Sequence, residues 1–463
     1  MNLFWFRSDL RAYDNLALSE AIATGNPVTA IYIATPEQWK MHDDAPIKLD
    51  FWRRNLLGLE ESLKRLGIPL LYFQVASYAE VPHLFKELAL SLKFSHLYFN
   101  AEYPLNEHRR DGMVETVCLQ QGIRINTSHD QVLLQPGSVL NKSVLPFRVF
   151  TPFSRKCRTM IRMQDAPKAI SVLNAPVSSL PQLKAQCGLE DIDWPEANVD
   201  WASRWPAGEA HAQALLQTFC ENSIKDYKEN RDFPAVDGTS TLAPWMNAGV
   251  ISIRDCWRKA TSCHQGDGAE TWKSELLWRE FYKHIFFHYP HVSKKLAFKP
   301  NVSHVPWRHD KEDFKRWCEG RTGIPIVDAA MRQLSQTGWM HNRLRMVTAM
   351  FLTKHLLIDW RWGEKWFMEH LVDGDFSANN GGWQWSASTG TDSVPYFRVF
   401  NPVTQSKRFD AEGDFIRKFV PELKNLDRRF IHEPKQHKPP EYPDPLIDLK
   451  FGRERALNAF KSE

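Results

Sequence analysis

Two helical patterns in the second half of the chain place polar side chains on otherwise apolar faces. In the first, Glu275 has Trp272 three residues before it and Trp278 and Arg279 three and four residues after it, so the four share one helix face. A carboxyl group among indoles would be poorly solvated and, when protonated, could donate a hydrogen bond to a ligand. Periodicity leaves a second interpretation open, in which Glu275 is a solvated residue beside Arg279.

The second pattern places Asn342, Arg345, Met346 and Ala349 on one stripe of a later helix. Two polar groups on an apolar face indicate a lined pocket, although a helix edge would give the same pattern.

A turn with several hydroxyl groups, Gly238-Thr239-Ser240-Thr241, is the third candidate. Hydroxyls and backbone amides in such a turn can hold a phosphate, whereas the commoner interpretation is a helix N-cap.

No metal site is predicted. The loop that begins at Asp373 has Ala378 where a calcium loop needs glycine at its sixth position. His284, His288 and His291 lack the glutamate that a zinc protease motif would carry.

The elements that must position these residues fall into two classes. The first 131 residues alternate between short apolar runs and helical patterns, which predicts a doubly wound parallel sheet. We expect strands at residues 3–6, 28–34, 70–75 and 96–99, and helices at 15–23, 49–66, 79–92 and 106–121. Because no GxGxxG follows the first strand, this domain is not predicted to hold NAD.

The pattern then changes. Residues 132–200 are acidic and rich in proline, and we interpret them as an interdomain linker. From residue 201 to 463 the apolar period is helical, with helices expected at 211–221, 271–287, 311–319, 326–337, 342–357 and 362–372. The fold class expected is therefore α/β followed by an all-helical domain.

The composition limits which partners and which cellular compartment the protein could have. The 463 residues carry a net charge of +4, and since residues 165–200 hold six acids and two lysines, the rest carries +8, which permits an anionic partner. Seven scattered cysteines, no apolar run of membrane-spanning length and no signal peptide indicate a cytoplasmic protein, expected to be a monomer. Fourteen of the 18 tryptophans lie at or beyond Trp201, which suits a flat aromatic ligand or a bulky core.

Five segments together resemble the photolyase/cryptochrome family, and within it the class I cyclobutane pyrimidine dimer photolyases of bacteria. They are WFRSDLRAYDNLAL at 5–18, RDFPAVDGTS at 231–240, WREFY at 278–282, TGIPIVDAAMRQLSQTGWMHNRLRMV at 322–347 and DGDFSANNGGWQWSASTGTD at 373–392. The resemblance implies an α/β antenna domain at residues 1–131, a linker at 132–200 and a helical FAD-binding catalytic domain at 201–463.

The resemblance also implies how FAD would be held. Ala243 stands where close relatives have serine, so one hydroxyl contact is expected to be lost. Arg345 and Asp373 would form an ion pair over the isoalloxazine ring, and Asn379 would face flavin N5, where asparagine favours the reduced anionic flavin. The other positions implied are Tyr227, Thr239, Ser240, Thr241, Leu242, Trp272, Arg279, Gly374 and Asp375.

The implied substrate is a pyrimidine dimer in UV-damaged DNA, flipped out of the duplex. Trp278 and Trp385 would clasp the dimer, Glu275 and Asn342 would hydrogen-bond it, and Met346 would pack beside it. The phosphate contacts implied are Arg231, Arg343, Arg398 and Lys407.

Two further sets are implied. Trp307, Trp360 and Trp383 correspond to the electron-hopping triad that re-reduces FAD. The antenna positions correspond to those of relatives that carry 5,10-methenyltetrahydrofolate, namely His42, Asn106, Glu107 and Lys294. Other members use deazaflavin or flavin as antenna, so these remain alternatives.

The main alternative function is a cryptochrome, a flavin photoreceptor without repair activity. Asn379, the intact dimer pocket and the expected lack of a long signalling tail after residue 463 favour repair. Repair of (6-4) photoproducts needs a histidine pair in the pocket, where this chain has Asn342 and Met346.

Overall fold

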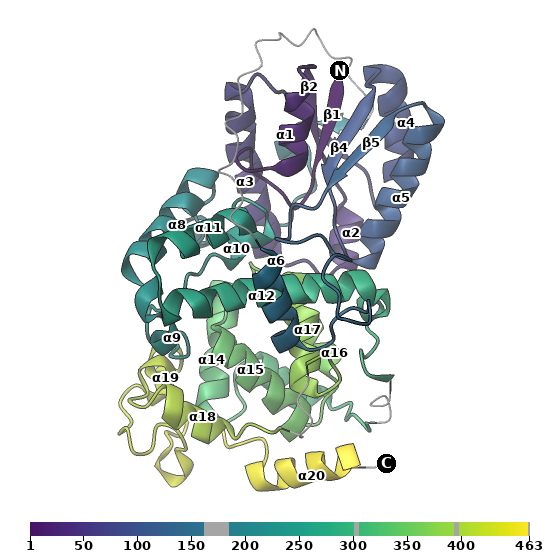
Figure 1. The fold of residues 1–463 in the computed structure, drawn as a ribbon. Coiled ribbons are helices and arrows are strands. Elements are labelled where there is room, and N and C mark those ends of the chain that lie inside the picture. The colour runs from purple at the N-terminus through teal and green to yellow at the C-terminus, as the bar shows by residue number, and fades with distance from the viewer. Residues whose placement is uncertain (162–184, 301–304, 393–397, 462–463) are drawn as a thin grey trace. The chain divides into compact units, whose positions relative to one another are not determined.

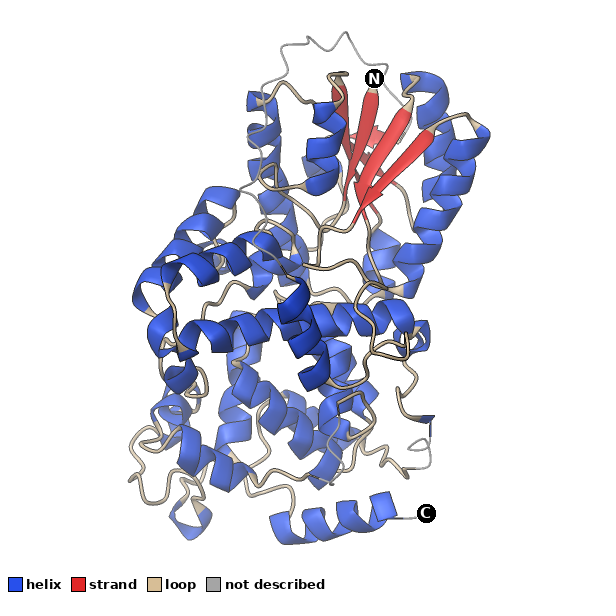
Figure 2. Ribbon diagram, in the orientation of Figure 1, coloured by secondary structure: helices blue, strands red, loops and turns tan. Residues whose placement is uncertain are grey.

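A six-stranded sheet occupies the N-terminal part of the chain, and Figure 2 shows its strands in red. The computed structural model describes residues 1–161, 185–300, 305–392 and 398–461. Five strands are parallel, in the order β5-β4-β1-β2-β3, and β6 pairs antiparallel with β3 at the edge. Their bounds are β1 Asn2–Phe6, β2 Val28–Ala34, β3 Leu70–Gln74, β4 His96–Asn100, β5 Arg124–Ser128 and β6 Gln186–Cys187.

Helices cover the parallel strands, as a doubly wound sheet requires (Figure 1). Leu3 and Trp5 of β1 point to the same face and pack with Leu88 and Val114 of α4 and α5. The helices between the strands are α1 Leu16–Ala23, α2 Pro36–Met41, α3 Pro46–Arg65, α4 Val81–Leu92 and α5 Leu105–Gln120.

The chain divides into two compact units, and helices dominate beyond the sheet. The first unit comprises Met1–Phe147, Thr151–Ile224 and Ser240–Pro290, and the second comprises Arg148–Phe150, Lys225–Thr239 and His291–Glu463. The first unit therefore takes in helices on both sides of the predicted boundary at residue 201. These helices are α6 Phe150–Met160, which starts one residue before the unit, α7 Asp200–Arg204, α8 Glu209–Asn222, α10 Ala243–Asn247, α11 Ile253–Cys263 and α12 Asp267–His288.

The regular elements of the second unit are helices, among its described residues, and the unit has its own core. Trp317, Met331, Leu344, Trp360 and Trp383 are all buried in it. Its helices are α9 Tyr227–Asn230, α13 Lys311–Cys318, α14 Pro325–Thr337, α15 Asn342–Met350, α16 Trp360–Met368, α17 Phe376–Ala387, α18 Pro402–Phe409, α19 Asp414–Phe419 and α20 Leu449–Lys461, with a π-helical turn at Phe351–His355.

The predicted fold class is confirmed, and the deviations have local causes. The helix expected at 342–357 ends as an α-helix at Met350 and continues as the π-helical turn. Helix α6 lies within the predicted linker and was not expected from the sequence. Helix α17 was not expected either, because α17 contains Gly381, Gly382 and two asparagines and is buried on most sides, which removes any amphipathic period. One third of the predicted linker, residues 162–184, lies outside the described residues.

Among the described residues, none of the helices combines the length and the apolar character that a membrane crossing requires.

Candidate functional site

Helix α12 in the first unit carries the pattern around Glu275. Trp272 is buried and packs on Phe219, with ring centroids 4.9 Å apart. Glu275, Trp278 and Arg279 are half-buried. Arg279 is fixed at its tip, because Nη1 donates to the carbonyl of Gln131 at 2.6 Å. The helix thus presents a carboxyl group, an indole and a guanidinium along one side.

The hydroxyl-rich turn crosses from the second unit into the first. Gly238 packs tightly, since a Cβ there would lie 2.6 Å from Cβ of Asn230. Thr241 adopts a left-handed backbone with φ of 48°, which side chains of this kind rarely adopt. Leu242 is buried as the N-cap of α10, and Ala243 begins that helix at the surface. A strained, tightly packed turn of this kind is common where a backbone approaches a ligand.

Arg345 and Asp373 form an ion pair in the second unit. The Nη2 atom of Arg345 donates to both carboxylate oxygens at 3.0 and 2.8 Å, and its Nε donates to the carbonyl of Met340 at 2.8 Å. The Asp373 side chain is 4% exposed and the Arg345 side chain 25%, so the pair has one buried end and one accessible end. Gly374 follows in the buried turn.

The start of α17 fixes the next two predicted residues. Asp375 is the N-cap, and its Oδ1 accepts from the backbone nitrogens of Ser377 and Ala378 at 2.9 and 3.1 Å. The Nδ2 atom of Asn379 donates to the carbonyl of Glu364 at 2.9 Å, which directs the amide oxygen the other way.

Three tryptophans share the core of the second unit. Trp383 lies directly on α16, since a Cβ at Gly363 would meet its Cη2 at 2.1 Å. Trp360 is one helical turn before Gly363 and is buried. Trp307 is half-buried and packs against the same core. Trp360 and Trp383 are therefore fully buried, whereas Trp307 is partly exposed.

The indole nitrogen of Trp383 is buried and has no hydrogen-bond partner among the described residues. Buried donors are nearly always satisfied, so this atom fits a bound group that supplies an acceptor.

Two of the predicted DNA-contacting groups lie together in the second unit. The Arg398 guanidinium stands 6.0 Å from the ring centroid of half-buried Trp385. Lys407 is exposed on α18, and Asn342 is exposed at the first turn of α15, with half-buried Met346 one turn later.

The other two predicted phosphate contacts share an acidic partner. Arg343 Nη2 lies 2.7 Å from Asp232 Oδ2, and Arg231 Nε lies 3.8 Å from its Oδ1. Arg231 also stands 5.6 Å from the ring of buried Tyr227, and Arg343 stands 4.4 Å from the ring of Phe409. The two arginines are therefore oriented by one carboxylate and two aromatic rings.

The predicted antenna residues lie in both units. In the first, His42 Nε2 is 3.1 Å from Asn106 Nδ2, and its Nδ1 is 3.6 Å from Glu107 Oε1. Burial raises the pKa of Glu107 while His42 opposes the rise, and Oε2 of Glu107 is buried without a hydrogen-bond partner among the described residues. Lys294 belongs to the second unit and is exposed.

Two protein-family models match this chain. Residues 2–171 match the model of DNA photolyase, and residues 272–462 match the FAD-binding domain of DNA photolyase. The chain belongs to the DNA photolyase family. The expected resemblance is thus confirmed, and FAD is the cofactor of the matched helical domain.

The similarity to individual relatives covers the entire length of this chain. The deoxyribodipyrimidine photo-lyase of Vibrio cholerae is 45% identical and is aligned over 100% of this chain and 99% of its own. A cryptochrome of Synechocystis is 28% identical with a TM-score of 0.88, over 99% of this chain and 98% of its own. An archaeal photolyase from Sulfolobus tokodaii, solved with two FAD molecules, is 30% identical with a TM-score of 0.83 over 100% of both chains.

Sequence reasoning missed three residues that hold the predicted ones in place. Asp232 pairs with Arg343, Glu364 accepts from Asn379, and Gly363 carries the Trp383 ring. Asp232 and Gly363 stand inside or beside the expected segments, but no spacing links them to partners many residues away.

Proposed function

We propose that this photolyase-family chain splits cyclobutane pyrimidine dimers in DNA under light. The observation that carries the proposal is the 45% identity to a deoxyribodipyrimidine photo-lyase along the full length of both chains. Bound in its reduced form and excited by light, FAD supplies the electron for the splitting. No protein residue acts as nucleophile or general base.

The residues of the second unit orient and tune the cofactor. The Arg345 guanidinium is held by Asp373 and by a backbone carbonyl, so it provides a fixed positive charge that needs no rearrangement when charge develops. Asn379 contributes a neutral amide whose orientation Glu364 fixes. The unpaired Trp383 nitrogen supplies one observation within this unit that fits a bound group.

The dimer itself would be recognised by aromatic and polar groups. Trp278 and Trp385 clasp it, Glu275 and Asn342 hydrogen-bond it, Met346 packs beside it, and Arg231, Arg343, Arg398 and Lys407 contact phosphates. Phosphate contacts position the DNA, whereas contacts to the flipped bases select the damage.

A titration of damaged and undamaged duplexes at several salt concentrations tests this division. Trp278→Ala should weaken binding of damaged DNA by about 1–3 kcal/mol, one to two decades, and leave undamaged DNA unaffected. Arg398→Ala should weaken both and reduce the salt slope by about one. An equal loss for both duplexes with Trp278→Ala would make the indole a core residue.

The role of Glu275 is separable from binding. If its carboxyl group stabilises charge on the dimer, Glu275→Ala should lower the quantum yield of repair several-fold under saturating substrate. An unchanged quantum yield would show that Glu275 has no role in the chemistry.

The wild-type protein tests the function itself. If the reduced wild-type protein repairs no dimers, a photoreceptor function would be favoured.

We further propose that the first unit binds a folate antenna. The proposal rests on Glu107. Its Oε2 atom is buried and has no hydrogen-bond partner among the described residues, and burial raises the pKa of its carboxyl group. The amino and ring N–H groups of a pterin are donors of the kind that such an oxygen accepts.

Reconstitution with 5,10-methenyltetrahydrofolate, followed by gel filtration and absorption spectroscopy, tests this proposal. We expect a near-ultraviolet band that Glu107→Ala abolishes. Retention of a second flavin instead would identify an antenna like that of the archaeal neighbour.

A further inference from the structure

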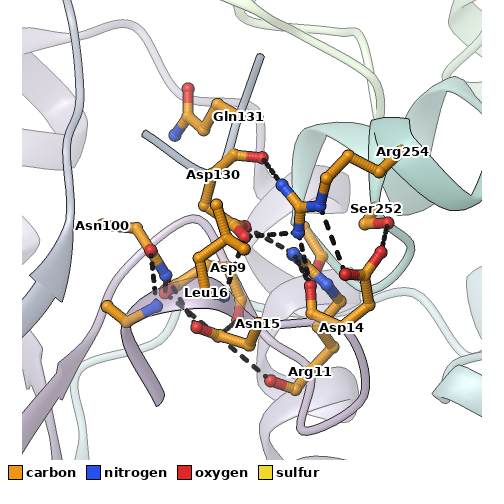
Figure 3. Close-up of polar contacts among 12 residues, drawn as sticks. Asp9, Arg11, Asp14, Asn15, Leu16, Asn100, Asp130, Gln131, Ser252 and Arg254 are labelled. Carbon is orange, nitrogen blue, oxygen red and sulfur yellow. Dashed lines mark hydrogen bonds and ion pairs between the residues drawn. The ribbon is translucent and has the colours of Figure 1, made fainter. Parts of the chain in front are cut away.

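A five-residue segment that begins two residues after the end of β5 connects the sheet to the helices of the first unit. We call residues 130–134 the strap. At its first residue, Asp130 Oδ2 accepts from Arg11 at 2.5 Å and Oδ1 accepts from Arg254 of α11 at 2.7 Å (Figure 3). The backbone nitrogen of Leu16 also donates to Asp130 at 3.1 Å.

This anchor is electrostatically strong. Burial alone would raise the pKa of Asp130, but Arg11 and Arg254 hold it at about 2. Both arginines are also tied to Asp14 through its backbone carbonyl, and Arg254 Nε lies 3.2 Å from the Asp14 carboxylate (Figure 3). Asp130 is therefore held in one place by a network whose side chains are all buried.

The other end of the strap is anchored to α12 by Glu280. This side chain is fully buried, and it accepts from the backbone nitrogens of Leu133 at 2.8 Å and Leu134 at 2.9 Å. His284, one turn later, lies 3.0 Å from the carbonyl of Leu134 through Nε2. A buried carboxylate is stable only when hydrogen-bond donors satisfy it, and here the backbone nitrogens of the strap do so. Glu280 therefore fixes the position of the strap along α12.

Between the two anchors lies Gln131, whose carbonyl accepts from Arg279 Nη1 at 2.6 Å. Arg279 is the residue immediately before Glu280, and Nη2 also reaches the carbonyl of Met246 at 3.4 Å. The conformation of the long Arg279 side chain thus depends on where the strap holds Gln131.

We propose that Glu280 is a positioning residue that acts through the strap on Arg279, and thereby on the binding of FAD. The inference rests on the proposed function in one respect, the contact of Arg279 with the cofactor. Glu280 does not itself touch the cofactor in this scheme; it keeps the Gln131 carbonyl in place, and the carbonyl keeps the guanidinium in place.

A double-mutant cycle on the full-length holoprotein tests the inference through the rate at which FAD is released, followed by its fluorescence. Residues that contact one another in one network have coupled effects, so we expect Glu280→Gln to accelerate release at least about threefold when Arg279 is present. In the Arg279→Ala background the same substitution should change the rate by less than about twofold. Glu270→Gln on the same helix is the matched control, because Glu270 pairs with Lys273 and Arg158 at the surface and should leave the rate unchanged.

His284→Phe covers the case in which Glu280→Gln does not fold. It removes the bond to Leu134 and leaves an aromatic ring beside Phe153, whose centroid is 5.1 Å away. Its effect should likewise vanish when Arg279 is alanine.

Two outcomes separate the inference from the function on which it rests. In the first, Arg279→Ala alone accelerates release of FAD, and the rate increases of the two single variants multiply in the double variant. This outcome would overturn only the positioning role. Release at the wild-type rate from Arg279→Ala would remove Arg279 from the cofactor site and the inference with it, while leaving repair activity to be judged by its own assay.

Discussion

Asp232 lies beside two arginines that we expect to contact DNA, so we expect a DNA phosphate to compete with it. It pairs with Arg343 and lies near Arg231, the two arginines that we expect to contact the backbone of DNA. Both partners are partly exposed, at 18% for Arg343 and 32% for Asp232, so the pair is accessible to a competing anion.

We expect Asp232→Asn to tighten binding of damaged and undamaged DNA alike. Release of Arg343 from an ion pair worth up to about 1 kcal/mol corresponds to about fivefold in affinity, with a steeper salt dependence. Filter binding at several salt concentrations measures both. Asp237→Asn removes the same charge from an exposed side chain of the same segment and should have a smaller effect. Weaker binding by Asp232→Asn would show that the orientation which Asp232 gives the arginines matters more for DNA binding than its competition with phosphate.

His341 makes stability depend on pH. It is buried as the N-cap of α15, and its Nδ1 accepts from the backbone nitrogen of Arg343 at 3.2 Å. Burial lowers its pKa to about 4, with help from Arg343, Arg345 and Arg231 and against the effect of Asp232. Folded His341 therefore stays neutral between pH 6.5 and 4, where the unfolded chain takes up a proton.

Stability should consequently fall as the pH drops through this window. The loss from His341 is about 2 kcal/mol at pH 5 relative to pH 7.5. His341→Asn keeps a capping acceptor and removes the titration, so its urea midpoint should fall less over the same interval. Equal falls for both proteins would assign the acid sensitivity to other groups.

At the residue scale, one pair of partners could be expected from the family resemblance, but the other partners could not. The motifs named Arg345 and Asp373 together, and the structure joins them. Nothing in the sequence relates Asp232 to Arg343, because their pairing depends on how the turn after α9 and the start of α15 meet in three dimensions.

At the scale of elements, α16 and α17 show how a glycine can decide a contact. The Trp383 ring occupies the space where Gly363 lacks a side chain. A Cβ at 2.1 Å cannot be accommodated unless the ring or the helix moves.

We expect Gly363→Ala to destabilise the protein by about 1–3 kcal/mol, although alanine is the better helix former. It should also impair light-driven reduction of the flavin, since Trp383 would be displaced. The control is Gly382→Ala, on the exposed side of α17 with no atom within 4 Å of the new Cβ, which should be neutral or stabilising. Thermal unfolding of both variants measures the difference, and an equally stable Gly363→Ala would contradict the close packing.

The sequence predicted four of the five parallel strands and most of the long helices, because their apolar residues recur with a clear period. It missed β5 because Arg124–Ser128 is a polar strand at the sheet edge, and β6 because two residues carry no pattern. It missed α17 because a helix buried on most sides shows no polar face.

At the scale of the whole molecule, one hydrophobic core contains Trp360 and Trp383, and Trp307 packs against it. We expect these three tryptophans to refill the flavin with electrons. Trp307→Phe should abolish reduction of oxidised FAD by an external reductant in light, because phenylalanine is much harder to oxidise. Repair by chemically pre-reduced protein should be intact. Trp362→Phe, at a half-buried residue against the same core, is the control. Loss of repair in the pre-reduced Trp307 variant would contradict the separation of the two electron paths.

The antiparallel strand β6 has a consequence for any attempt to isolate the sheet. Tyr72 and Phe73 of β3 pair with Cys187 and Gln186, which come from far beyond the predicted antenna boundary at residue 131. A fragment that ends there would leave the β6-facing edge of β3 unpaired, and an unprotected strand edge is a template for another chain. We therefore expect a fragment of residues 1–131 to aggregate, and one extended through residue 194 to remain dispersed at the same concentration.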